Sequence, residues 1–344
     1  MLAFFRECLH TMIVGRTGSG KTTLLLQIER AFLNADKRLK VIHRDDGKCE
    51  FLYQLPVVGR IKVFIPYGCR FVYEDIEGEV AVQHYDPDNP LGIIDNIARS
   101  RGFRYFVVMF DNFCINPDLS AEFWAKWWTA LIYHAMSTPL ARKKPILLSF
   151  EEINDILRPR GWGITKVHDE VEGLLSYNFN KLRGHGIRLL CSTHRPQQLS
   201  RDIRSQIDWI FIKRSSGDDI YDWLNRILIR LSNPVFYYLI GFINEMPQEQ
   251  FVAIDPYRKL DICVNEDIER WPVQYEIGGC IKRPERTKRF DEIDMFIAVA
   301  RAKPNPMPFK EIAKHVKLNI RTVYKRWEKL RQEEFLAPLL YGED

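Results

Sequence analysis

The sequence predicts an α/β protein, in which helices flank a mainly parallel sheet, followed by a small helical domain at the C-terminus. Two observations predict the sheet. A glycine-rich motif lies between an apolar segment and a helical pattern near the start of the chain, and further short apolar runs alternate with helical patterns up to about residue 255. Such alternation is typical of the strand–helix–strand units that build parallel sheets. A third observation, a basic segment with short helical patterns after residue 289, predicts the separate domain.

The glycine-rich motif is GRTGSGKT, residues 15–22, which fits the phosphate-binding pattern G-x-x-x-x-G-K-[ST] at every fixed position. Residues 12–14 predict a strand before it, and residues 23–28 predict the start of a helix after it. Glycines let the backbone approach a polyphosphate closely, and the helix N-terminus adds positive potential. Lys21 can reach the β- and γ-phosphates, and the Thr22 hydroxyl can hold Mg²⁺. The residues predicted to bind the nucleotide are Gly15, Thr17, Gly18, Ser19, Gly20, Lys21, Thr22 and Thr23.

The chain has 344 residues and a net charge of +5, and the positive excess lies at its C-terminal end. Residues 281–344 contain 15 Lys or Arg against 10 Asp or Glu, so the rest of the chain is neutral. This favours a polyanion partner at the C-terminus, although a solvated helical end would have the same composition. The seven cysteines form no C-x-x-C pair, which favours idle thiols in a reducing cytoplasm over a zinc site or a disulfide framework.

No secretion signal is visible at the N-terminus, and the longest apolar run, 235–243, is too short to cross a bilayer. Apolar runs predict strands, and amphipathic periodicity predicts helices. Strands are expected at 39–43, 61–65, 80–82, 105–110, 145–150, 187–192, 208–213 and 249–254, and helices at 91–99, 120–136, 168–183 and 218–231. The helix at 120–136 carries an aromatic stripe, which is more typical of a core or subunit interface than of stacking on single-stranded nucleic acid.

Two adjacent carboxylates, Glu151 and Glu152, follow the apolar run at 145–150. Ligands of parallel sheets bind at the carboxyl ends of the strands, so both are expected beside the phosphate loop. There one carboxylate can join the Mg²⁺ shell and a second can orient the attacking water, although acidic residues also favour helix starts. His194 follows the next apolar run, where it can sense the γ-phosphate or serve a purely structural role.

The chain changes in character after the last predicted strand. Residues 256–288 are irregular and contain several prolines and glycines, which indicates a linker or a strap over the surface of the core domain at 1–255. Residues 289–344 predict helices at 290–301, 309–315 and 320–334, and the last two with their turn make a helix-turn-helix pattern. Such a domain can bind DNA or a protein. The residues predicted to face DNA are Arg321, Lys325, Arg326 and Lys329.

Taken together, these segments resemble the FtsK/HerA superfamily of P-loop motor ATPases over about residues 10–255. The specific part is LRGHGIRLLCSTHRPQQLSRDIRSQIDWIFIKR, residues 182–214, which resembles the superfamily's arginine before a glycine-containing turn, its sensor strand and its T-Q-R-P-like signature. EMPQEQFVAID, residues 245–255, resembles its last strand after an L-P-x-G-E turn. The compact layout, with no barrel before the first strand, is similar to genome-packaging ATPases of tailless, membrane-containing viruses and to plasmid-encoded relatives.

The resemblance implies a RecA-like P-loop NTPase core that uses ATP and Mg²⁺. Glu151 stands at the Walker B position, where aspartate is usual, and His194 stands where a sensor glutamine is typical. Arg183 matches an arginine that reaches the nucleotide of the neighbouring subunit. The implied catalytic residues are Lys21, Glu152, Arg183 and His194, and the implied metal ligands are Thr22 and Glu151.

The resemblance further implies an ATP-driven translocase of double-stranded DNA, working as a homo-oligomeric ring such as a hexamer, in viral genome packaging or as a plasmid or conjugative DNA pump. The expected location is the cytoplasm or, for a virus, the host cytoplasm or the virion, with a capsid or membrane vertex as a further partner. Two alternatives remain open. One is a nucleotide-switched DNA-binding regulator, and the other is an assembly or secretion ATPase that does not act on DNA.

Overall fold

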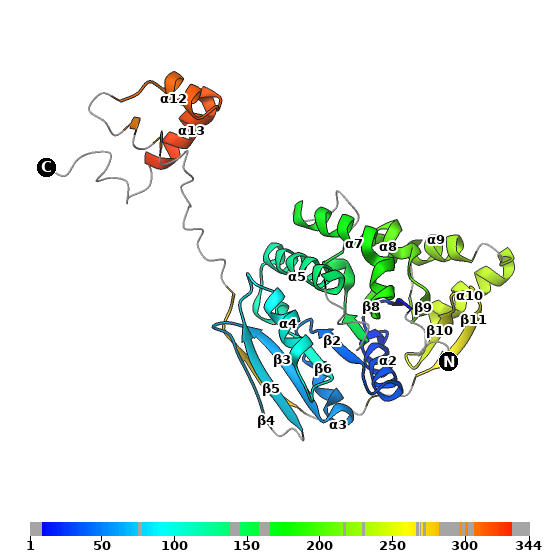
Figure 1. The fold of residues 1–344 in the computed structure, drawn as a ribbon. Coiled ribbons are helices and arrows are strands. Elements are labelled where there is room, and N and C mark those ends of the chain that lie inside the picture. Colours follow the sequence, from blue (N-terminus) through cyan, green and yellow to red (C-terminus); the bar gives the residue numbers. More distant parts are fainter. Residues whose placement is uncertain are drawn as a thin grey trace. The chain divides into compact units, whose positions relative to one another are not determined.

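The computed structural model describes residues 9–74, 78–137, 145–157, 166–215, 218–228, 231–265, 268, 270, 273–281, 296–297, 300–301 and 306–331. The chain divides into two compact units, Met1–Ile281 and Lys282–Asp344. The first unit contains the sheet and the phosphate loop, and the second contains the C-terminal helices (Figure 1).

The described part of the first unit forms a sheet of ten strands (Figure 1). Neighbouring strands are parallel except at one edge, where β10 runs antiparallel to β9 and β11 runs antiparallel to β10. In spatial order the strands are β11 (Leu260–Val264), β10 (Gln250–Ile254), β9 (Trp209–Ile212), β1 (Thr11–Val14), β8 (Ile187–Thr193), β7 (Ile146–Phe150), β2 (Lys40–Arg44), β6 (Tyr105–Val108), β3 (Arg60–Pro66) and β5 (Glu79–Tyr85).

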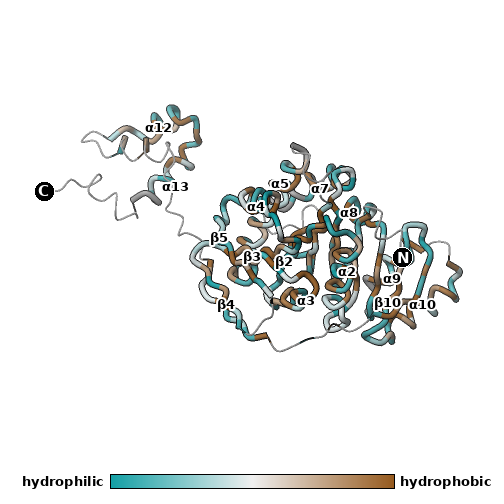
Figure 2. Tube along the Cα trace, turned by 60° about the horizontal axis from the view of Figure 1, so that its bottom comes forward, coloured by the Kyte–Doolittle hydropathy of each residue, from teal (hydrophilic) through white to brown (hydrophobic). Residues whose placement is uncertain are grey.

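Helices cover both faces of this sheet, so its central strands are buried on both sides. In β1, Met12 and Val14 belong to one hydrophobic cluster and Ile13 belongs to the other. Continuous apolar runs are the pattern that such doubly covered parallel strands require, and Figure 2 shows hydrophobic segments along the middle of the unit. One face is covered by α2 (Lys21–Ala35) and α3 (Leu55–Val58). The other is covered by α4 (Leu91–Arg99), α5 (Pro117–Ser137), α7 (Lys166–Gly184), α8 (Arg201–Ser205), α9 (Asp218–Ile227) and α10 (Asn233–Glu245).

The aromatic stripe of α5 lies in the core, as its spacing predicts. Trp124, Trp127 and Trp128 are fully buried, and all three rings pack around Phe150 at the end of β7. This helix therefore anchors the strand that carries the carboxylate pair. The preference for a core over base stacking is confirmed.

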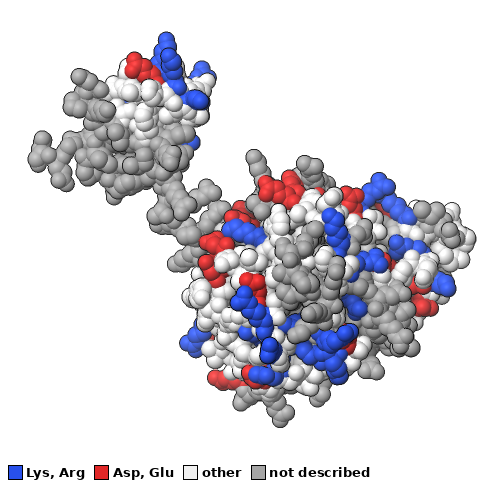
Figure 3. Space-filling view, viewed as in Figure 1, with Lys and Arg blue, Asp and Glu red and all other residues white. Residues whose placement is uncertain are grey.

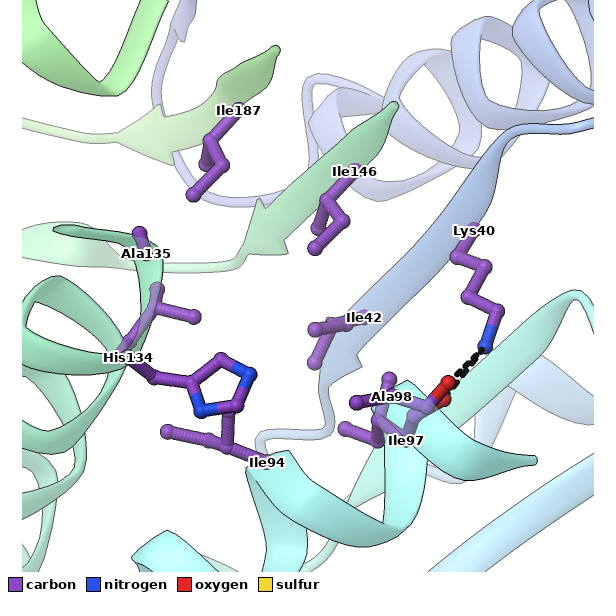
Figure 4. A pocket seen from close by; sticks show the side chains of 10 residues that line it. Lys40, Ile42, Ile94, Ile97, Ala98, His134, Ala135, Ile146 and Ile187 are labelled. Carbon is purple, nitrogen blue, oxygen red and sulfur yellow. Dashed lines mark hydrogen bonds between the residues drawn. The ribbon is translucent and has the colours of Figure 1, made fainter. Parts of the chain in front are cut away.

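A buried lysine fixes the neighbouring helix. Lys40, at the start of β2, donates from Nζ to the Ile97 carbonyl oxygen at 2.5 Å (Figure 4). The same Nζ donates to the Ser100 carbonyl oxygen at 3.1 Å. The last carbonyls of a helix lack intrahelical partners, and a cation there is favoured by the helix dipole. A small apolar cavity beside it is lined by the residues drawn in Figure 4.

The composition of 256–288 predicts a linker or a strap, but its described part contains two strands. One is β11, which extends the main sheet, and the other is β12 (Gln274–Gly278), which pairs antiparallel with β4 (Arg70–Glu74). Because both strands pair within the first unit, the division of the chain falls after Ile281, inside the segment 256–288 that the sequence predicts to be a linker or strap. Residues 282–288 lie outside the described residues.

The second unit contains α12 (Phe309–His315) and α13 (Ile320–Arg331), joined by a four-residue turn in which Lys317 has a φ of 54°. Both helices begin as predicted. Their packed side chains include Ile312, Val323 and Trp327, together with Ile297. Most of the helix expected at 290–301, and the chain beyond 331, lie outside the described residues.

Within the described residues, no helix is both long enough and apolar enough to span a bilayer. The apolar run at 235–243 lies within α10, which has 13 residues.

Candidate nucleotide-binding site

The phosphate loop joins β1 to α2, and its backbone requires glycine at three positions. Gly18 and Gly20 have φ of 72° and 84°, in the left-handed region that glycine tolerates best. At Gly15 a Cβ atom would lie 2.6 Å from Ser19 Oγ and 2.8 Å from Lys213 Cβ. The loop is attached to the sheet because Gly15 N donates to the Thr193 carbonyl at 3.2 Å. The N-cap Gly20 supplies no side-chain cap, so the first N–H groups of α2 can bind an anion.

Lys21, the first residue of α2, is buried among polar groups from two other strand ends. Its Nζ lies 3.3 Å from Glu152 Oε1 and 2.9 Å from His194 Nδ1. Burial lowers the pKa of Lys21, and the charge of Glu152 opposes that shift. The ammonium group of Lys21 and the carboxylate of Glu152 thus form an ion pair.

Glu152 and His194 form the second part of the site. Glu152 follows β7 with a φ of 42°, and its N–H donates to Ser192 Oγ at 3.2 Å. His194 follows β8, and its Nε2 lies 2.9 Å from Glu152 Oε1. With its proton on Nε2, the imidazole donates to Glu152, while its Nδ1 lies 2.9 Å from both Lys21 Nζ and the carbonyl oxygen of Gly15. The structure therefore brings Lys21, Glu152 and His194 together at the carboxyl edge of the sheet.

Thr22 and Glu151 form a pair of oxygen ligands beside this triad. Thr22 Oγ1 donates to Glu151 Oε2 at 2.9 Å, and Glu151 is only 4% exposed. Burial, together with the charge of Asp46, raises the pKa of Glu151 to about 7. A divalent cation would stabilise this buried carboxylate, so the two side chains fit Mg²⁺.

In the described part of the chain, no group of three or more His, Cys, Asp or Glu residues is arranged to hold a metal ion by itself.

Arg44 at the end of β2 is a residue of this site that sequence reasoning missed. It is 3% exposed, and its Nη1 donates to the Glu151 carbonyl at 2.7 Å. Its Nε donates to Asp111 Oδ2 at 2.8 Å, and Trp124 Nε1 donates to the same oxygen at 3.0 Å. Arg44 thereby holds the backbone turn that aims both carboxylates. The local sequence RDDGK indicates only a polar turn. The residue that Arg44 contacts, Glu151, lies 107 residues later in the chain, so no local pattern could predict the contact.

A buried ion pair lies beneath α2. His43 Nδ1 is 2.9 Å from Glu29 Oε1, and both side chains are almost fully buried. Tyr105 and Gln54 donate to the other carboxylate oxygen of Glu29. Burial alone would lower the pKa of His43, but the charge and hydrogen bond of Glu29 raise it to about 9. The imidazolium thus links β2 to the helix that carries Lys21.

Two groups of predicted residues lie outside this site. Arg183 Nη1 is 3.3 Å from Asp208 Oδ1, and Asp208 also accepts from His10 N at 2.9 Å, at the amino ends of β1 and β9. Arg183 is therefore at the opposite edge of the sheet from Lys21 in the same chain.

The basic residues predicted to face DNA are on α13 in the second unit. Arg321 and Lys325 are exposed and Arg326 is half-buried, while the side chain of Lys329 lies outside the described residues. Figure 3 shows basic side chains gathered along one edge of this unit, and both signs of charge interspersed over the first unit.

No family model and no curated protein matches the chain. Among solved structures it is similar to the genome packaging NTPase B204 of Sulfolobus turreted icosahedral virus 2 in complex with AMPPCP, with 16% identity, a TM-score of 0.45, and coverage of 75% of this chain and 98% of that chain. It is similar to the pCW3 conjugation coupling protein TcpA, with 13% identity, a TM-score of 0.40, and coverage of 76% and 61%. A third similar structure is EssC, ATPases 2 and 3, from Geobacillus thermodenitrificans, with 9% identity, a TM-score of 0.42, and coverage of 77% and 40%.

At identities of 16% or less and TM-scores of 0.45 or less, these likenesses carry no argument about what this chain does. Its function is inferred from the residues of its own site.

Proposed function

We propose that this protein is a Mg²⁺-dependent ATPase that translocates double-stranded DNA. The observation that supports the proposal is the convergence of Lys21, Glu152 and His194 around one strand edge, with Thr22 and Glu151 paired beside them. A phosphate loop, a buried carboxylate for the cation and a second carboxylate for water are the parts that phosphoryl transfer to water needs. The preference for ATP comes from the superfamily resemblance of residues 182–214.

Each side chain has a role that its contacts suggest. Lys21 exchanges its contact with Glu152 for the β- and γ-phosphates, which releases the Glu152 carboxylate to orient the attacking water and accept its proton. His194 hydrogen-bonds Glu152 and holds that carboxylate in place. Thr22 and Glu151 would hold Mg²⁺, which shields the phosphate charge when bound. The cluster needs no rearrangement of the sheet, because Glu151, Glu152 and His194 follow buried strands and Lys21 and Thr22 begin α2.

The finer parts of the proposal concern assembly and DNA. Arg183 lies at the opposite edge of the sheet from the phosphate loop of its own chain. We propose that it serves the nucleotide site of an adjoining copy, in a homo-oligomeric ring such as a hexamer with sites between subunits. The two described helices of the second unit, with Arg321 and Lys325 exposed, suit a helix-turn-helix domain that recruits DNA or a partner. Genome packaging, with a capsid or membrane vertex as partner, or conjugative DNA transfer would employ such a motor.

The decisive experiment measures ATP hydrolysis with and without duplex DNA, alongside particle mass in the presence of ATP. We expect at least about tenfold stimulation by duplex DNA, lost as salt rises, and a discrete ring mass with ATP. Slow hydrolysis unaffected by DNA, with a sequence-specific footprint, would favour a regulator. Hydrolysis without DNA stimulation or DNA binding would favour an assembly or secretion ATPase.

A further inference from the structure

A surface groove of about 530 Å³ lies over α5, on the face of the sheet opposite to α2. Because α5 packs against both α4 and α7, it forms the floor of the groove. One wall is the loop 86–90 with the first residue of α4, and the other wall is the first part of α7. None of the described residues that line the groove belongs to the nucleotide-binding site, so the proposed function leaves this groove without a role.

The floor of the groove is mainly apolar and has room for a helix. It follows α5 over residues 126–133, which is about two helical turns. The small side chains of Thr129 and Ala130 lie in the middle of this stretch, where they let another backbone approach closely. Two larger apolar side chains border them and are open to solvent, Tyr133 at 62% and Leu91 at 43% exposed. A concave apolar surface with a polar rim is typical of a protein–protein contact.

The rim of the groove is acidic on both sides. Asp88, in the loop before α4, and Glu170, in the first part of α7, are exposed lining residues. Asp86 lies on the same rim as Asp88, because its Oδ1 accepts from Asp88 N at 2.9 Å. Lys126 also lines the groove, but its Nζ lies 3.1 Å from Asp88 Oδ1 and 3.5 Å from Glu122 Oε1, so its charge is already compensated. The excess charge around the floor is therefore negative.

We propose that this groove is a docking site for a partner protein that inserts a basic amphipathic helix of about two to three turns. The apolar side chains of that helix would lie on the floor beside Ala130 and Tyr133, and its Lys or Arg side chains would meet Asp88 and Glu170. The same carboxylates repel phosphate groups, which argues against a nucleic acid or an anionic lipid surface here. The inference goes beyond the proposed function and does not depend on it, because the groove and the nucleotide-binding site share no described residue.

The test measures the binding of a fluorescently labelled synthetic peptide to the full-length protein by anisotropy. The probe is a helical peptide of about twelve residues with leucine on one face and lysine on the other. The control peptide has the same composition, but its leucines are spread around the helix. We expect wild type to bind the amphipathic peptide at least about tenfold more tightly than the control peptide, with an affinity that falls as salt rises.

Variants of the groove separate its floor from its rim. Ala130→Phe fills the floor and should weaken peptide binding at least about tenfold. Asp88→Asn with Glu170→Gln removes two rim charges but keeps their shape, and should weaken binding about three- to tenfold. Asp222→Asn with Asp261→Asn removes two exposed carboxylates outside the groove, so this matched control should stay within about twofold of wild type.

Three results would overturn the docking site. The first is equal affinity for the two peptides, because charge alone would then recruit the probe. The second is wild-type affinity in a folded Ala130→Phe variant; if that variant lowers the unfolding midpoint, the exposed Tyr133→Ala replaces it and should weaken binding about fivefold. The third is failure of wild type to bind the peptide, and self-association that Ala130→Phe abolishes would then identify a second copy of this chain as the occupant. ATP turnover of every variant should match wild type, which keeps this test separate from that of the proposed function.

Discussion

The two flanks of β1 are built differently, although both border the phosphate loop. On the inner flank, toward β8, β7 and β2, the residues Lys21, Glu151 and Arg44 are 7, 4 and 3% exposed. Lys21 pairs with Glu152, Glu151 accepts from Thr22, and Arg44 donates to the Glu151 carbonyl. On the outer flank, toward β10 and β11, Gln248 and Glu249 are exposed and Arg270 is 49% exposed. Removing one partner of a buried ion pair destabilises the protein strongly, because the other charge is left without compensation. Replacing an exposed charged residue changes the free energy of unfolding little.

This contrast suggests a division of labour. Substitutions on the inner flank should change turnover or global stability, because each leaves another buried charge without its partner. Substitutions on the outer flank should change nucleotide affinity and little else. The predictions below test that division, from the largest expected effect to the smallest.

Lys21→Ala should reduce ATP turnover at least about a thousandfold, because it removes the cation that lies 3.3 Å from Glu152 and 2.9 Å from His194. The measurement is steady-state phosphate release with saturating ATP and duplex DNA. Lys37→Ala, exposed after the same helix, is the control and should match wild type. Turnover within tenfold of wild type would contradict the catalytic assignment of the inner flank.

Arg44→Ala should destabilise the protein by about 3–5 kcal/mol, because it leaves Asp111 charged and partly buried and removes the donor to the Glu151 carbonyl. Urea unfolding measures the loss. Arg38→Ala is a matched control, since that arginine is 74% exposed and its ion pair with Asp36 should contribute less than about 1 kcal/mol. Arg44→Lys should restore part of the stability but less of the turnover, since it lacks the planar fork that meets both partners.

Stability should fall as pH rises from about 6.5 to about 9, because the folded state holds the His43 proton more tightly than the unfolded chain does. The stabilisation that the His43 proton contributes is complete at a pH below the pKa of His43 in the unfolded chain. It disappears above the pKa of about 9 that His43 has in the folded protein. It amounts to about 3 kcal/mol for a shift of this size. Unfolding free energies at pH 6, 7.5 and 9 for wild type and His43→Gln measure it as a difference. Parallel pH profiles for the two proteins would show that the Glu29 ion pair does not titrate as described.

Local patterns predict most of the first unit and fail where partners are distant in sequence. The helix at 91–99 and the strands from 187 and 250 follow from periodicity and apolar runs within each segment. β12 could not be predicted, since it pairs with β4 about 200 residues earlier and neither strand has a distinct alternation. The same holds within the site. Lys21, Thr22 and the carboxylates occupy motif positions, whereas Arg44 acts through a carbonyl 107 residues away and Arg270 through a hydroxyl 247 residues away.

Thr23→Val gives the smallest effect and the sharpest test of the outer flank. Valine keeps the shape of threonine but removes the hydroxyl that accepts from Arg270 at 2.9 Å. Loss of one partly exposed hydrogen bond should raise the KM for ATP about two- to threefold, with kcat unchanged, because Arg270 loses an anchor while the inner flank is untouched. Thr129→Val, which removes a hydroxyl within α5, is the matched control and should leave KM unaltered. A fall in kcat instead of a rise in KM would mean that Thr23 acts with the catalytic residues, and the separation of the two flanks would then be wrong.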